Sequence, residues 1–132
     1  MYAVTAQQQQ QEIRDTLDAM FAEWNREDQV KYLTHYWRSP EMRWSMKGVW
    51  YKGWQSMYDV YGAGFPPGAM GVIAYTDLEV QMLEDGLGIA LYEWTHNTPT
   101  ERIAGCTGQI FRKIDGAWLV IHENSARKPS GN

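Results

Sequence analysis

The strongest constraint on the fold lies near the C-terminus, in residues 102–129. Two runs rich in β-branched and aromatic residues flank Asp115-Gly116. An Asp-Gly pair tolerates the positive φ angles of a tight hairpin turn, so the pattern predicts two long antiparallel strands. The second strand ends in the polar run from His122 to Ser125. We therefore expect a β-rich C-terminal half that presents polar side chains at the end of one strand.

The N-terminal half predicts helices separated by short strands. From Gln8 to Asn25 apolar residues recur every three or four positions, the pattern of an amphipathic helix. A second helix is expected from Asp28, a favoured N-cap, to Tyr36, and a third from Trp54 to Tyr61. The other expected segments are a disordered tail at 1–7, strands at 42–47 and 49–52, and a Gly- and Pro-rich loop at 62–71.

After Gly71 the pattern is β throughout. Alternating apolar and polar residues predict four long antiparallel strands, with turns at Asp85-Gly86, 97–101 and Asp115-Gly116. Helices segregated from such a sheet make an α+β architecture, in which the sheet curls around the helices. The chain has 132 residues, and we expect residues 1–132 to form one domain with a conical interior.

Charge and composition exclude several classes of partner. A formal net charge of −4 without a cluster of Lys and Arg argues against nucleic acid. The sequence has neither a membrane-spanning stretch nor the pattern of a secretory signal. The single Cys106 forms no internal disulfide, so a reduced, cytoplasmic setting is expected. The histidines lack metal-ligand spacing and no Gly-rich strand-to-helix turn is present, so we expect neither a metal nor a nucleotide cofactor.

The element order and the ending Asp-Gly-Ala-Trp-Leu-Val-Ile-His-Glu-Asn-Ser carry a resemblance. They are similar to the SnoaL-like branch of the nuclear transport factor 2-like superfamily and to the association domain of calcium/calmodulin-dependent kinase II. The likeness covers residues 12–128 and includes Gly53-Trp54. It implies a cone of three N-terminal helices packed in a curved, mostly antiparallel sheet. It also implies homodimers through the outer sheet face and a pocket that serves isomerases, cyclases, dehydratases or binding proteins. The second histidine of the family ending is Asn124 here, so proton chemistry at that position would differ.

The predicted turns decide which side chains face the interior. Two-residue turns at Asp85-Gly86 and Asp115-Gly116 predict the pairs Met82–Ile89, Val80–Leu91, Leu78–Glu93, Trp118–Lys113, Val120–Phe111, His122–Gln109 and Asn124–Thr107. A three-residue loop at 99–101 then brings Glu93 to the same inner face. A four-residue loop would instead turn Tyr92, Trp94 and His96 inward. We prefer the shorter loop because it gathers the aliphatic side chains into one patch.

An apolar cleft with a few convergent polar groups is typical of a small-molecule site. Within it, His122 near Glu93 predicts an acid–base pair, since a carboxylate that orients an imidazole raises its pKa. The alternative is a structural histidine bonded to Gln109 or Thr107. The expected ligand-binding residues are Gln109, Asn124, Thr107, Trp44, Tyr58 and Trp54, although aromatic residues at such spacing also pack in cores.

Two functions therefore stay open. The first is a cofactor-independent acid–base enzyme, an isomerase, cyclase, dehydratase or hydrolase, acting on a small, mostly apolar organic compound. The second is a non-catalytic ligand-binding or oligomerisation module. In the preferred register an apolar outer patch predicts a homodimer interface; its members are Tyr92, Trp94, Ile110, Leu119 and Ile121.

Overall fold

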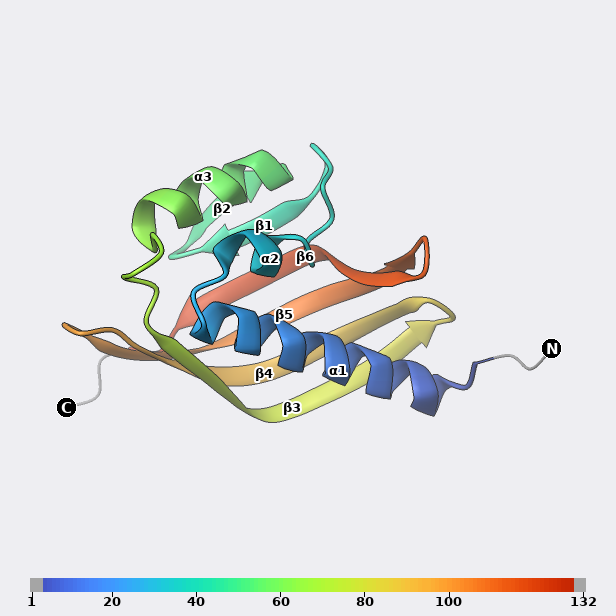
Figure 1. Cartoon of the computed structure of the whole chain (residues 1–132). Coiled ribbons are helices and arrows are strands. Elements are labelled where there is room, and N and C mark those ends of the chain that lie inside the picture. Colours follow the sequence, from blue (N-terminus) through green and yellow to red (C-terminus); the bar gives the residue numbers. More distant parts are fainter. Residues whose placement is uncertain (1–3, 130–132) are drawn as a thin grey trace.

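The computed structural model describes residues 4–129, which form three helices and six strands (Figure 1). The helices are α1 (Ala6–Asn25), α2 (Gln29–Leu33) and α3 (Trp54–Gly64). The strands are β1 (Arg43–Met46), β2 (Val49–Lys52), β3 (Val72–Glu84), β4 (Leu87–Asn97), β5 (Arg102–Ile114) and β6 (Ala117–Arg127). The predicted α+β class, with helices preceding a long antiparallel meander, is confirmed.

Helix α1 starts earlier than predicted because its first turn is capped. The Thr5 side chain accepts from the backbone N–H of Gln8, and the Gln8 side chain accepts from the backbone N–H of Thr5. This reciprocal pair satisfies two N–H groups that lack helical partners. Residues from Ala6 onward are therefore helical where a tail to residue 7 was predicted, and residues 1–3 lie outside the described part of the chain.

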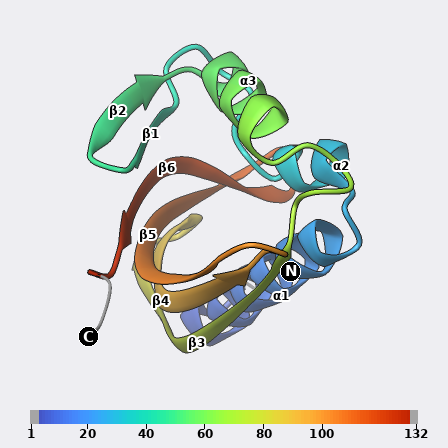
Figure 2. The same cartoon turned by 90° about the vertical axis from the view of Figure 1, so that its left-hand side faces the viewer.

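One mixed sheet holds all six strands in the order β2-β1-β6-β5-β4-β3. Among the strand pairings within residues 4–129, β1–β6 is parallel and the others are antiparallel. The long strands β3 to β6 curl so that their concave side wraps α1, as the end-on view shows (Figure 2). The apolar stripe of α1 is buried against this side; it consists of Ile13, Leu17, Met20, Phe21 and Trp24. The hydrophobic core thus lies between the curled sheet and the helices.

The turn between β4 and β5 corrects the preferred register. Asn97 pairs with Arg102, so the loop has the four residues 98–101. Tyr92 therefore pairs with Thr107 and Glu93 with Cys106. Because successive side chains alternate between faces, Tyr92, Trp94 and His96 point inward while Glu93 and Leu91 point outward. The predicted place of Tyr92 and Trp94 on the outer face was wrong, and the alternative with a four-residue loop is correct.

The two hairpin turns lie where predicted, but each hairpin contains an irregularity in its strand pairing. Across the Asp85-Gly86 turn, a register shift near Leu83 pairs Met82 with Gly88 and Val80 with Ala90, so the predicted partners Ile89 and Leu91 were wrong. Across the Asp115-Gly116 turn, the predicted pairs Trp118–Lys113 and Val120–Phe111 are present.

Beyond Val120 the β5–β6 register shifts by one residue. His122 pairs with Ile110 and Glu123 with Gln109, so Ile121 is the extra residue of a bulge. On one side β6 pairs with β5 along its length, and the bulge lies where its partner on the other side changes. Val120 bonds to the segment around Tyr36, whereas His122 and the residues after it pair with β1. The strand must bend between these partners, and the bend turns Glu123 inward in place of His122.

Candidate functional site

A cavity of about 110 Å³ lies inside the curled sheet, between α1, α2, α3 and the inner face of β4 to β6. A cavity of about 150 Å³ holds benzene, so this smaller space encloses at most about one small ring. Its lining is mainly aromatic, with a few polar groups at either end. The lining residues are Phe21, Trp24, Tyr32, Met46, Lys47, Tyr61, Phe65, Ile73, Tyr92, Trp94, His96, Ile103, Thr107, Glu123, Ser125, Ala126 and Arg127.

Glu123 is the one acidic residue of this lining, and only 4% of its surface is exposed. Its Oε1 accepts a hydrogen bond from the Tyr36 hydroxyl at 2.6 Å and another from Gln109 Nε2 at 2.6 Å. Burial raises the pKa of the Glu123 carboxyl above its ordinary value, and these two hydrogen bonds partly offset that rise. Within residues 4–129 both bonds go to Oε1, which leaves Oε2 for a guest in the cavity.

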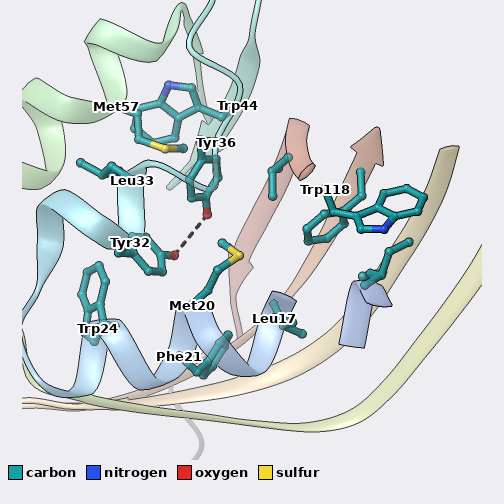
Figure 3. Packing of buried hydrophobic residues seen from close by; sticks show 14 of the residues in the cluster. Leu17, Met20, Phe21, Trp24, Tyr32, Leu33, Tyr36, Trp44, Met57 and Trp118 are labelled. Atoms are coloured by element: carbon teal, nitrogen blue, oxygen red, sulfur yellow. Dashed lines mark hydrogen bonds between the residues drawn. The ribbon is translucent and has the colours of Figure 1, made fainter. Parts of the chain in front are cut away.

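A short chain of hydroxyls leads to Glu123. Tyr36 has one hydrogen and gives it to Glu123, so the 3.1 Å contact with Tyr32 is a bond that Tyr32 donates. Figure 3 shows these two rings meeting above Met20 and Phe21 of α1. Burial, followed by the nearby charge of Glu123, raises the pKa of the Tyr32, Tyr36 and Tyr61 hydroxyls. These phenols consequently stay protonated and act as hydrogen-bond donors around the carboxyl.

His96 closes another side of the cavity. Its Nε2 lies 2.6 Å from the backbone oxygen of Met70, which also accepts from Trp24 Nε1 at 3.1 Å. A carbonyl oxygen only accepts, so Nε2 of His96 carries a hydrogen, and in the neutral ring Nδ1 is the acceptor. The same contacts hold the segment before β3 against α1. Glu27 adds two further bonds there, from the backbone N–H groups of Gly68 and Met70.

Solved structures resemble this architecture closely. A protein of unknown function from Shewanella oneidensis MR-1, described as NTF-2 like, matches with a TM-score of 0.83 at 22% identity over 88% of this chain and 97% of that one. A nuclear transport factor 2-like superfamily protein from Salmonella enterica serovar Typhimurium matches with a TM-score of 0.80 at 13% identity over 97% and 96% of the two chains. This chain has the nuclear transport factor 2-like fold. The predicted resemblance is thus confirmed at the level of the fold.

Another neighbour with the nuclear transport factor 2-like fold is assigned as a calcium/calmodulin dependent protein kinase II association domain, from Xanthomonas campestris. It matches with a TM-score of 0.68 at 16% identity over 99% of this chain and 94% of that one. No family model matches the chain, and no curated protein matches its sequence. Within residues 4–129, no helix is long and apolar enough to cross a membrane, and no group of three or more His, Cys, Asp or Glu side chains could hold a metal ion.

The predicted acid–base residues lie outside the cavity of the nuclear transport factor 2-like fold. His122 is on the outer sheet face beside the Trp50 ring, with 5.7 Å between ring centroids, and Glu93 is on that face bonded to Lys128. Their partners on β5 are Ile110 and Cys106. Four residues along a strand span about 13 Å, so the structure does not bring the two side chains together. Their catalytic roles stay predictions without an enclosed pocket around them.

The predicted ligand-binding residues divide between the two faces. Thr107 lines the cavity, and Gln109 lies beside it through its bond to Glu123. Asn124 points to the outer face, where it accepts from Ser45. The three aromatic candidates serve packing roles away from the cavity: Trp44 is fully buried and donates to Ser56, Trp54 donates to the Leu33 carbonyl, and Tyr58 is 45% exposed and stacks on Trp54.

Sequence reasoning missed Glu123, and it placed Tyr92, Trp94 and His96 in the cavity only through the alternative loop. The signal for the last three was present, because a four-residue loop turns all of them inward. The signal for Glu123 was weaker. Glu123 directly follows the run Trp-Leu-Val-Ile-His, but only the bulge at Ile121 shows which face of the strand it occupies.

Proposed function

We propose that the protein binds a small, mostly apolar organic molecule in the aromatic cavity and that Glu123 acts on it as an acid–base group. The observation that carries this proposal is a buried carboxyl with a raised pKa that lines the cavity and is oriented by Tyr36 and Gln109. Such a carboxyl exchanges protons nearer neutral pH than an exposed one, which is what general acid–base catalysis requires. This proposal assigns to Glu123 the acid–base role that the sequence predicted for His122.

The chemistry that fits is proton transfer next to a carbonyl group. The ionised Glu123 carboxylate would remove a proton from the carbon beside the carbonyl, and the electrons of that C–H bond would form the enolate. The negative charge would then rest on the substrate oxygen, close to the hydroxyls of Tyr61 and Tyr92, which line the same cavity. Hydrogen bonds from protonated phenols stabilise such an oxyanion in a site that excludes water. Return of the proton to another atom gives isomerisation.

The test uses cyclohexanone as a probe that fits one ring. Its binding should quench or shift the tryptophan fluorescence, because Trp24 and Trp94 line the cavity. In D2O, proton NMR should show exchange of its α-protons faster than in buffer, with a rate that rises as Glu123 ionises. Glu123→Gln keeps the shape and removes the base, so the exchange should fall to the buffer rate. Glu84→Gln, at an exposed position by the β3–β4 turn, is the matched control.

Two results decide between the candidate functions. Binding without any exchange above the buffer rate favours the non-catalytic ligand-binding module and overturns the enzymatic part. If cyclohexanone and other small ketones and epoxides leave the fluorescence unchanged, or if Glu123→Gln exchanges protons as fast as the wild type, the assignment of this cavity or of Glu123 is wrong.

We also propose that the outer face of the sheet forms a homodimer. Apolar side chains remain on this face after the register correction, among them Leu91, which is 46% exposed, and Ile110, Leu119 and Ile121. A neighbour of the same fold is assigned as an association domain, which supports assembly into oligomers. Leu119→Asp and Ile121→Asp should sediment as monomers. An unchanged dimer in both variants would exclude this face as the contact.

We further propose that residues 1–132 act as one domain in the cytoplasm. The single sheet and the helices against it support one folding unit. Cys106 is a free and exposed thiol, which favours a reducing setting. Limited proteolysis that yields two stable fragments would contradict the single domain.

A further inference from the structure

The two ends of the aromatic cavity carry groups of opposite charge. Glu123, Ser125 and Arg127 follow one another on the inner side of β6, and all three line the cavity. Four residues of strand span about 13 Å, so the carboxyl and the guanidinium stand near opposite ends of the space. Lys47 lies at the Arg127 end, because β1 runs parallel to β6 with Ser45 beside Asn124, and Lys47 follows two residues later.

We propose that the ligand is a small organic anion. Its carboxylate binds Lys47 and Arg127, and its apolar body lies among the aromatic rings and reaches Glu123. This inference rests on the proposed function and adds a substrate class to it. It also fixes an orientation. The reacting carbon would lie at the inner end of the cavity, and the charged group at the outer end.

The outer end carries an excess of positive charge. Within residues 4–129 Arg127 makes one ion pair, from its Nη1 to Glu101 Oε1 at 3.4 Å, and its other guanidinium N–H groups have no partner among those residues. Lys47 has no ion pair within residues 4–129. The formal net charge of −4 repels anions from the molecule as a whole. The two cations at the cavity entrance attract anions to that place.

The uncharged polar groups near this end also suit an acceptor. Trp94 has an indole Nε1–H that is buried without a partner in the described part of the chain. Thr107 and Ser125 share one hydrogen bond of 2.9 Å, and Thr107 also interacts with the Tyr92 hydroxyl, so this group of hydroxyls lies together beside the cavity. A carboxylate accepts from such donors, whereas an ammonium group finds no carboxylate at this end within residues 4–129 except the already paired Glu101.

An organic cation is the competing ligand class. Aromatic rings around a carboxylate are a known arrangement for ammonium groups, and Glu123 lies among several such rings. Burial raises the pKa of the Glu123 carboxyl, however, so below that pKa a cation meets a neutral acid there. The two cations at the entrance would also oppose the passage of an ammonium ion.

The experiment compares three probes with the same ring: cyclohexanecarboxylate, cyclohexanecarboxamide and cyclohexylamine. Their dissociation constants are measured by tryptophan fluorescence at low salt. The carboxylate should bind at least tenfold more tightly than the amide or the amine, and this preference should shrink in 0.5 M NaCl, since exposed charges are screened. Lys47→Gln should remove most of the preference.

Lys52→Gln is the matched control, because it changes the net charge by the same amount as Lys47→Gln. Lys52 belongs to the same hairpin but does not line the cavity. The control should keep the carboxylate preference. Arg127→Gln provides a second variant if Lys47→Gln does not fold, and it should also reduce the preference. Equal affinities for carboxylate and amide, tighter binding of the amine, or equal effects of Lys47→Gln and Lys52→Gln would overturn the inference.

The two proposals fail in different ways. If the amide binds as tightly as the carboxylate and the proton exchange of cyclohexanone depends on Glu123, the proposed function stands and only the anionic ligand class is wrong. If none of the three probes binds and the exchange is absent, the proposed function is wrong as well, and the anionic class is lost with it.

Discussion

The bond between Tyr36 and Glu123 gives the sharpest test of the buried carboxyl. Tyr36 is 1% exposed, and its hydroxyl donates to Glu123 Oε1 at 2.6 Å. Tyr36→Phe removes only that hydroxyl. The change takes one donor from the carboxyl, and it also takes the acceptor of the Tyr32 hydroxyl. We expect a loss of stability whose size depends on pH.

The expected magnitude follows from the ionisation state of Glu123. A hydrogen bond to a charged group contributes about 1.5–3 kcal/mol and a neutral one about 1 kcal/mol. Tyr36→Phe should therefore lower the free energy of unfolding by about 1 kcal/mol at acid pH and by about 2–3 kcal/mol once Glu123 is ionised.

The direction of the pH dependence follows from linkage. Burial raises the pKa of Glu123 in the folded protein above its value of 4.5 in a free carboxyl. The folded state thus holds the proton more tightly between these two values, and stability falls as pH rises through this window, by about 1.4 kcal/mol for each unit of difference. Tyr36 lowers that pKa, so Tyr36→Phe raises it further and extends the fall to higher pH.

Urea unfolding at a series of pH values from 4 to 9 measures these effects in the wild type, Tyr36→Phe, Glu123→Gln and the double variant. The gap between wild type and Tyr36→Phe should widen with pH. In the Glu123→Gln background the gap should be flat, because no carboxyl titrates there. At pH 8 the double-mutant cycle should give a coupling of about 1 kcal/mol or more. A gap that is constant with pH, or that is the same in both backgrounds, would refute the buried charged bond.

Three further predictions concern the frame of the cavity. In Gly105→Ala the added Cβ would overlap the Trp94 ring and the Ala126 carbonyl oxygen, so thermal unfolding should show a free energy of unfolding lower by about 1–3 kcal/mol. In Gly108→Ala the added Cβ meets only the flexible end of Leu91 at 3.3 Å, so the free energy of unfolding should fall by less than about 1 kcal/mol. Thr5→Ala removes the capping box of α1 and should cost about 1 kcal/mol in urea unfolding; no change would mean that the first turn is not held by this cap. Glu27→Ala should speed hydrogen exchange at the Gly68 and Met70 amides at least tenfold, since a bond to a charged group contributes about 1.5 kcal/mol or more, and unchanged exchange would show that other contacts hold this segment.

Features that depend on neighbouring residues were predictable from the sequence. The Asp-Gly pairs at 85–86 and 115–116 specify hairpin turns by their tolerance of positive φ, and Asp115 and Gly116 have φ values of 50° and 82° in the structure. The spacing of the α1 stripe specifies which side of that helix is buried. These patterns were sufficient for the element order, the α+β class and the resemblance to the nuclear transport factor 2-like fold.

The face of β4 was chosen wrongly for a physical reason. Joining the aliphatic side chains into one patch favoured Leu91 as an interior residue. The structure instead buries Tyr92, and Trp94 lines the cavity beside it. An aromatic side chain buries about 150–250 Å² of surface, more than a leucine can, so the register with the rings inside removes more apolar surface from water.

The identity of the proposed acid–base group depends on one extra residue in β6. Before the bulge at Ile121, the alternation set by the Asp115-Gly116 turn would aim His122 inward; after it, Glu123 is aimed inward. The bulge is required because Val120 pairs with the segment around Tyr36 while His122 pairs with β1, and those partners are remote in sequence. The same geometry brings the Tyr36 hydroxyl to Glu123, so one non-local contact both turns the carboxyl inward and supplies a donor to it. A prediction from the sequence of the strand alone does not include that contact, and it therefore selects the His122 imidazole.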